Sequence, residues 1–414
     1  MTIPDQLGQH ANGLYRKVNR RRVFEMVAGS GIASLLSGCG IPVRGTPVPA
    51  ASSTAATVLG IPNERFFPSF STAPLEQEFV SAVGRQRSSQ GVPPDAPLPE
   101  LELLSVSGGG ENGAFGAGLL CGWSAQGTRP VFELVTGVST GALIAPFAFL
   151  GSSYDPQLRY VFTGHFPKDI LANRIFSAAI FDDAMADNTP LFKTLSTYVN
   201  EAMLADIAAA YDTGRLLLLG TTDLDAQLPV IWNIGAIAKS GHPRALDTVR
   251  RVMLASAAIP GAFPPTMFDV TLDGKPYQEM HVDGGTFAQA FLYPAAVMQS
   301  RRARVLRHQA VLPVIAYVIR NARLDPEWAA VERRTLSIAE RAITTMIAAS
   351  GYNDVIRIYN NTLRDGIGYN LAYIGRDFTE VLPSPFDQKY MRDLFDYGYQ
   401  KALHGYVWAS QPPF

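Results

Sequence analysis

The sequence predicts an α/β protein with a mostly parallel central sheet and helices on both of its faces. Short apolar runs typical of buried strands alternate with longer helical patterns, and glycines mark several of the junctions. The first two units pair a strand at 101–106 with a helix at 114–125, and a strand at 131–135 with a helix at 142–150. This alternation favours a parallel sheet, because each crossover helix returns the chain to the edge where the strands begin.

The remaining elements follow the same logic. Asp273-Gly274 is typical of a tight turn and predicts a hairpin between two short strands. A last buried strand is expected to start at or after Pro313, because proline cannot donate to a central ladder. Further strands are expected at 215–222 and 230–233, and helices at 245–257, 329–350, 351–363 and 389–406.

Composition excludes several classes of protein. The chain has 414 residues, of which 47% are hydrophobic and 17% charged, so it can bury a large core and is neither disordered nor fibrous. The net charge of −1 argues against nucleic-acid binding, which depends on concentrated positive charge. The basic run 301–307 has no aromatic residue to stack on a base.

The pentapeptide Gly137–Gly141 has the pattern Gly-x-Ser-x-Gly. It follows an apolar strand and precedes an apolar helix, which is the context of a nucleophile elbow. The two glycines permit the cramped turn that exposes a serine hydroxyl at the edge of a sheet. Ser139 is therefore the first candidate for a catalytic nucleophile.

A glycine-rich run, Ser107–Gly113, lies between the first strand and the first helix. Bare backbone amides at a helix N-terminus can bind an anion, such as the oxyanion formed during acyl transfer. The spacing Gly-x-Gly-x-x-Gly also fits a dinucleotide site, which requires an acidic residue at the end of the next strand. Glu133 stands near the start of that strand, so an oxyanion loop is the favoured interpretation.

Two further motifs follow in order. The segment Ala255–Pro264 precedes a short extended run that ends in Asp283-Gly284-Gly285. Together with the glycine run and the Ser139 pentapeptide, these motifs resemble the patatin-like phospholipase family, over roughly residues 101–294. The ordered set of four is far more specific than any one of them.

The resemblance implies a three-layer α/β/α sandwich with a mostly parallel central sheet and a Ser–Asp dyad. Ser139 would be the nucleophile, Asp283 the base, and Gly108, Gly109 and Gly110 the oxyanion loop. The implied activity is hydrolysis of phospholipid or related ester lipids through an acyl-enzyme, without a cofactor. Asn112 stands where the family usually has Arg or Lys, so oxyanion stabilisation could differ from that of other members.

The sequence leaves several alternatives open. An ordinary α/β-hydrolase would use a histidine after its aspartate, here His308 or His404, whereas His281 is expected to form a structural hydrogen bond. No pair of histidines has metal-ligand spacing, so no metal is expected. The apolar segment 166–181 suits either a lid or core packing. A catalytically weak lipoprotein that binds lipid or a partner in the same pocket is the rival function.

The N-terminus resembles an export signal. Five basic residues within 16–22 precede the apolar run 23–36, and Leu36–Cys39 resembles the lipobox of bacterial lipoproteins. Cys39 would be acylated and would anchor the protein in the cell envelope, facing the periplasm from the outer membrane. Arg21-Arg22 also resembles a twin-arginine signal, which leaves Sec and twin-arginine export open.

These patterns divide the chain into four parts. We expect a signal peptide with lipobox at 1–38 and a lipid-anchored tether with an N-terminal extension at 39–100. Within the latter, the stretch 41–56 is rich in Pro, Ala, Thr and Ser and is expected to be flexible. A patatin-like catalytic core at 101–295 follows, and a C-terminal strand and helices at 296–414 complete the same domain.

Overall fold

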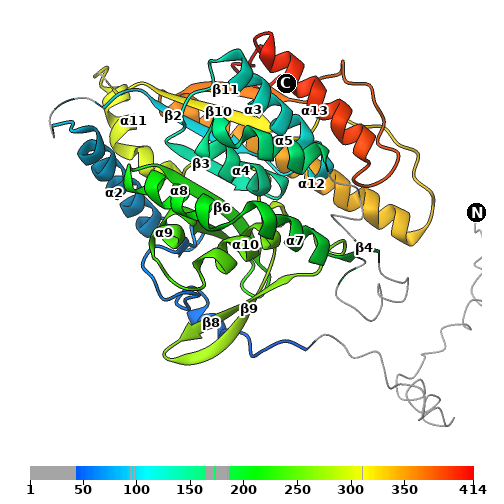
Figure 1. Ribbon diagram of the computed structural model, residues 1–414, viewed down its shortest axis with the longest axis horizontal. Coiled ribbons are helices and arrows are strands. Elements are labelled where there is room, and N and C mark those ends of the chain that lie inside the picture. Colours follow the sequence, from blue (N-terminus) through cyan, green and yellow to red (C-terminus); the bar gives the residue numbers. More distant parts are fainter. Residues whose placement is uncertain are drawn as a thin grey trace, which may run out of the picture. The chain divides into compact units, whose positions relative to one another are not determined.

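The computed structural model of the protein describes residues 43–93, 96, 98–164, 172–173, 184, 186–309 and 311–414. These residues form a three-layer α/β/α sandwich in which helices cover both faces of a mostly parallel sheet (Figure 1). The predicted fold class is thus confirmed. Cys39 with its lipobox, and all of the segment 166–181 except two residues, lie outside the described part of the chain.

The centre of the sheet is a block of parallel strands in the order β6-β3-β2-β10-β11. β7 and β1 extend it antiparallel beyond β6, and β9 pairs antiparallel with the end of β6 and with β8. A separate short ladder joins β4 and β5. The bounds are β1 Arg65–Phe66, β2 Leu101–Val106, β3 Leu134–Val138, β4 Ala172–Asn173, β5 Ala186–Asp187, β6 Leu216–Asp223, β7 Leu228–Asn233, β8 Thr266–Leu272, β9 Lys275–Asp283, β10 Val314–Arg320 and β11 Gly368–Tyr373.

Successive side chains of each central strand enter opposite cores, as the period of two in a strand requires. In β6, Leu217 and Leu219 join the core under α3, α4 and α13, whereas Leu216 and Leu218 join the core under α2 and α12. The bounds of the helices are α2 Ala73–Gln90, α3 Gly113–Gln126, α4 Thr140–Leu150, α5 Asp155–Thr163, α7 Thr189–Tyr198, α8 Glu201–Asp212, α9 Ile234–Lys239, α10 Ala245–Ser256, α11 Gln299–Leu306, α12 Thr335–Arg364 and α13 Gln388–Leu403.

Some local predictions hold, and others do not. The Asp273-Gly274 turn joins β8 to β9, with both residues at positive φ. The sequence predicts two helices, at 329–350 and 351–363, but the structure has a single helix there, because α12 continues through Gly351. A Cβ at Gly351 would lie 2.3 Å from the Arg320 guanidinium, so this glycine provides space for a side chain within the helix and does not end it.

The segment after Val43 is not a flexible tether, which corrects the prediction for this stretch. Arg44 donates two hydrogen bonds to Asp225, of 2.7 and 2.6 Å. Thr57 pairs with Thr271 of β8, and the side chains of Val58 and Leu59 are buried. Proline, alanine and threonine here form an ordered strip along the β8–β9 hairpin.

Candidate active site

Ser139 occupies a strained turn between β3 and α4. Its φ of 56° and ψ of −128° fall where residues other than glycine rarely lie. The turn needs both neighbouring glycines: a Cβ at Gly137 would lie 2.5 Å from the Gly141 carbonyl oxygen, and one at Gly141 would lie 2.1 Å from that of Val106. The sequence therefore places the Ser139 hydroxyl at the N-terminus of α4, at the carboxyl edge of the sheet.

Asp283 meets Ser139 from the end of β9. Its backbone N–H donates to Ala258, and its carboxylate accepts the Gly285 N–H at 2.7 Å. Burial raises the pKa of Asp283 to about 7, against the opposing effects of hydrogen bonds from the Ser139 hydroxyl and the Gly285 amide. A carboxylate in this position can accept a proton near neutral pH.

The C-terminal end of α10 and the residues directly after it hold both Ser139 and Asp283 in place. The Ser139 N–H donates to the Ser256 hydroxyl at 2.9 Å, and that hydroxyl donates to the Gly220 carbonyl at 2.6 Å. Ala258 accepts the Asp283 N–H. The start of the motif Ala255–Pro264 thus has a physical role that the sequence alone did not indicate: Ser256 fixes the turn at Ser139, and Ala258 fixes Asp283.

The glycine-rich loop lies beside Ser139, but its three glycines differ. The Gly108 N–H already donates to the Gln289 carbonyl at 3.0 Å, so this amide is not free to bind an oxyanion. Gly110, with a φ of 56°, lines the cavity at Ser139. Of the predicted oxyanion loop, this leaves the amides of Gly109 and Gly110 as the candidate donors.

Residues at and directly after the end of β10 hold this loop in place. The Asn321 side chain donates to the Ser107 carbonyl at 2.9 Å and accepts the Gly116 N–H at 3.0 Å. Arg320, also buried, donates to the Gly108 carbonyl at 3.2 Å. A Cβ at Gly109 would lie 2.0 Å from the Asn321 carbonyl oxygen, which explains why glycine is required there.

Glu133 cannot take part in a dinucleotide site at the glycine-rich loop. Its carboxylate accepts the Glu102 N–H at 2.6 Å, at the start of β2 and thus at the opposite edge of the sheet from Ser139. The geometry therefore favours the oxyanion interpretation of the glycine run over a dinucleotide site.

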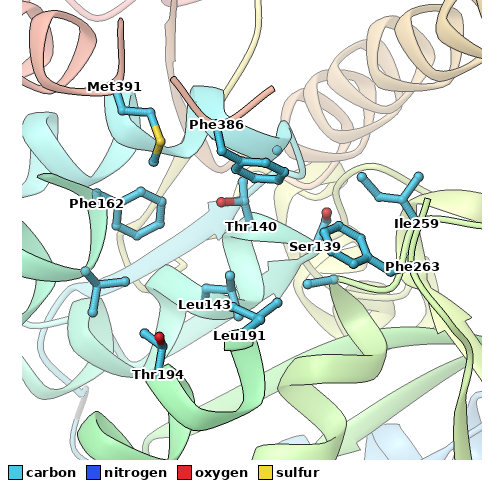
Figure 2. A pocket seen from close by; sticks show the side chains of 13 residues that line it. Ser139, Thr140, Leu143, Phe162, Leu191, Thr194, Ile259, Phe263, Phe386 and Met391 are labelled. Atoms are coloured by element: carbon cyan, nitrogen blue, oxygen red, sulfur yellow. The ribbon is translucent and has the colours of Figure 1, made fainter. Parts of the chain in front are cut away.

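An apolar cavity opens at Ser139. Together with its open mouth it encloses about 600 Å³, and it extends from Ser139 and Ile259 towards Phe162 and Met391 (Figure 2). The polar residues Thr140 and Thr194 also face it. The other lining residues are Gly110, Leu143, Val161, Leu191, Ala257, Phe263 and Phe386. Such a cavity suits a hydrocarbon chain with its polar end at the serine.

Asn112 ends the 3₁₀ turn that follows the glycines. Its side-chain oxygen accepts a hydrogen bond of 2.7 Å from the Tyr390 hydroxyl of α13. The amide therefore joins the glycine-rich loop to the helix that also contributes Met391 to the cavity.

The described histidines lie apart from the cavity. His281 is fully buried between the Thr221 hydroxyl, 2.9 Å from Nδ1, and the Glu279 carboxylate, 3.2 Å from Nε2, so its expected structural hydrogen bonds are present. His308 and His404 are exposed. His165 lies outside the described residues.

A buried polar cluster surrounds His281, which sequence spacing did not reveal. The cluster offers three possible ligand atoms, one each from Asp223, Glu279 and His281. These atoms lie within 4.8 Å of one another, which is close enough to hold a cation. The Arg65 guanidinium, however, already donates to both oxygens of Glu279, at 2.5 and 3.0 Å. Burial opposes ionisation of Glu279, but His281 and Arg65 lower its pKa to about 2. The positive charge at this cluster is thus supplied by arginine.

Comparison with known families agrees with this geometry. Residues 104–296 match the model of the family described as patatin-like phospholipase, and the matched segment includes Ser139, Ser256 and Asp283. No curated protein sequence matches the chain significantly.

Proposed function

Because residues 104–296 are a patatin-like phospholipase domain, we propose that the protein is a lipid acyl hydrolase in which Ser139 is the nucleophile and Asp283 the general base. The observation that carries the proposal is the buried Asp283 carboxylate. It lies beside a serine on a strained turn at the mouth of an apolar cavity, and the serine hydroxyl partly offsets the rise in its pKa that burial causes. Serine is a weak nucleophile until a neighbouring base removes its proton, and this arrangement supplies that base.

The chemistry follows in two steps. In the first, Asp283 takes the proton from Ser139 as Oγ attacks the ester carbonyl. The amides of Gly109 and Gly110 and the N-terminus of α4 stabilise the oxyanion. Collapse of this intermediate breaks the ester bond, and Asp283 returns the proton to the departing alcohol. In the second step Asp283 deprotonates a water molecule, which attacks the carbonyl of the acyl-enzyme. Collapse of this second intermediate breaks the ester bond to Ser139, Asp283 returns the proton to Ser139 Oγ, and the fatty acid leaves.

The apolar lining supports a lipid ester as the substrate. The acyl chain would lie along Leu143, Leu191 and Phe162, whereas the alcohol part would remain at the open mouth near Ile259. Burial of an acyl chain there contributes roughly 0.8 kcal/mol for each methylene group.

Hydrolysis of a short-chain nitrophenyl ester by the wild type and by Ser139→Ala tests the proposal. The variant should keep its fold and lose at least ~100-fold in kcat, because only binding and the oxyanion donors remain. The rival function, a lipid-binding lipoprotein, predicts instead that both proteins bind fatty acid and that their hydrolysis rates are equal.

A further inference from the structure

α12 projects far beyond the sheet that its second half covers. The helix connects β10 to the parallel strand β11, so it begins at the carboxyl edge of the sheet, where Ser139 lies, and runs back to the amino edge. Its 30 residues span about 45 Å, whereas the seven residues of β10 span about 23 Å. Figure 1 shows the first half of α12 extending past the ends of the strands.

The two halves differ in burial. In the second half, Val355 and Ile358 are buried in the core against β10 and β11. In the first half, all side chains of residues 342–349 are exposed and none of these residues is charged. Ile343 is 52% exposed and Met346 is 70% exposed. A helix that is uncharged and mainly apolar on every side normally lies inside an apolar environment.

The loops at the same edge add to this apolar surface. Trp328, in the loop that leads from β10 into α12, is 89% exposed, and Val381, in the loop after β11, is 83% exposed. The two loops are joined by an ion pair between Arg376 and Asp325. The second loop also supplies Phe386, which lines the cavity at Ser139. The exposed apolar side chains and the cavity therefore belong to one edge of the molecule.

We propose that this edge docks on the surface of a lipid bilayer, with residues 342–349 of α12 inserted among the acyl chains. A protein partner would cover one face of the helix, whereas lipid surrounds it, which matches exposure on all sides. The helix satisfies its own backbone hydrogen bonds, as insertion requires. The amphipathic ring of Trp328 suits the boundary between headgroups and acyl chains. The inference deepens the proposed function, because the site would then open directly onto its lipid substrate.

Two properties of the docking follow. Among the described residues no helix is long and apolar enough to cross a bilayer, and 342–349 span only about 12 Å, so the insertion is shallow. The charges before the stretch are mixed, with Glu340 beside Arg341 directly before it and Glu332 beside Arg333 and Arg334 further back. Binding should therefore depend on apolar contact more than on anionic lipid, and should persist in high salt.

The test measures binding of the chain expressed from residue 40 onwards to phosphatidylcholine vesicles at about 1 M salt, where exposed charges are screened within about 3 Å. This chain lacks both the expected lipid anchor at Cys39 and the apolar run 23–36, which would itself bind lipid. All proteins carry Ser139→Ala to prevent hydrolysis. Ile343→Glu/Met346→Glu should weaken sedimentation with vesicles by about tenfold or more. The matched control is Val80→Glu/Leu306→Glu, which places the same charges on side chains of 73% and 74% exposure on α2 and α11. The control should bind like its parent.

A second measurement uses vesicles of brominated phosphatidylcholine, which quench tryptophans at the level of the acyl chains. Quenching should be present in the parent and absent in Trp328→Phe. Equal vesicle binding by the α12 variant and the control would overturn the proposal. So would a dimer of the parent that the α12 substitutions convert to monomer without changing vesicle binding, since a second copy would then cover the helix.

Activity measurements separate this inference from the proposed function. With Ser139 intact, the α12 variant should hydrolyse a soluble nitrophenyl ester within about twofold of the control, but vesicle phospholipid about tenfold more slowly. Absence of ester hydrolysis in every protein, wild type included, would refute the hydrolase proposal and leave the binding comparison to decide the docking surface.

Discussion

At the scale of single residues, the protonation state of Asp283 should control activity. A base works only when ionised, and burial raises the pKa of this carboxyl to about 7. The value of kcat/KM should therefore rise as pH increases to about 7 and then level off. An acid limb near pH 4, the range of an ordinary aspartate, would contradict this role.

Substitution distinguishes a dyad from a triad. Asp283→Asn should be nearly as inactive as Ser139→Ala, because the asparagine amide cannot accept the proton. Single alanine substitutions at His165, His242, His281, His308 and His404 should leave the chemical step largely intact. An inactive but folded histidine variant beside a mildly affected Asp283→Asn would point to a triad instead.

Ser256 should act as a positioning residue. Ser256→Ala removes the acceptor of the Ser139 N–H and the donor to Gly220. Two buried polar groups would lose their partner, which lowers the free energy of unfolding by roughly 1–3 kcal/mol. The Ser139 turn would also relax, so kcat should fall more than KM rises.

Ser105→Ala is the matched control, since Ser105 is equally buried and donates to the Phe291 carbonyl at 2.7 Å, away from Ser139. It should lower stability without a comparable effect on kcat. Equal loss of kcat in both variants would show that general destabilisation, and not the position of Ser139, is responsible.

The sequence was sufficient for the Ser139 turn because that geometry is local. Gly137 and Gly141 lie within two residues of Ser139, and the strand and helix around them have clear patterns. The roles of Asn321, Gln289 and Tyr390 could not be predicted, because each depends on a contact between residues more than a hundred positions apart. For the same reason, the sequence could not predict that the Gly108 amide is already hydrogen-bonded.

At the scale of elements, a buried ion pair between Arg65 and Glu279 joins β1 to β9, the strand that ends in Asp283. Both side chains are 2% exposed. Arg65→Ala would leave Glu279 charged and buried near the Asp223 carboxylate, with His281 as its remaining hydrogen-bond partner, so the free energy of unfolding should fall by about 3–5 kcal/mol. Denaturant melts provide the measurement.

The comparison for that melt is Lys239→Ala, which breaks an ion pair with Asp212 whose side chains are 54% and 47% exposed. Exposed pairs contribute at most about 1 kcal/mol, so this variant should remain close to wild type. A similar loss in both variants would mean that burial does not decide the strength of the pair.

The segment 44–59, which lies along the β8–β9 hairpin, shows that composition alone does not distinguish a flexible linker from an ordered segment. Proline and small residues are typical of linkers, and the sequence predicts a tether at 41–56 on that basis. The decisive contacts are those of Arg44 with Asp225 and of Thr57 with Thr271, both distant in sequence. This segment is ordered because it packs against the β8–β9 hairpin, and its own composition gives no sign of that hairpin.

At the scale of the whole molecule, the parallel topology gathers everything the proposed reaction needs at one edge. The strands β2, β3, β6, β10 and β11 all end there, and the loops after them supply the glycines, Ser139, Asn321 and Phe386. This concentration is a general property of parallel sheets. The fold class could therefore predict where the site lies, although not which distant side chains support it.

The sequence also predicts where the whole chain lies in the cell, because its N-terminus resembles a lipoprotein signal. We propose that Cys39 is diacylated, because Leu36–Cys39 follows five basic residues and an apolar run. Two acyl chains suffice for stable anchoring, whereas one is marginal. Mass spectrometry of the purified protein should find a mature N-terminus at Cys39 with its lipid attached, and Cys39→Ser should leave an unprocessed chain. A mature N-terminus elsewhere with an unmodified Cys39 would refute the anchor. Docking of α12 would then be the main interaction that attaches the protein to a membrane, since it does not depend on Cys39.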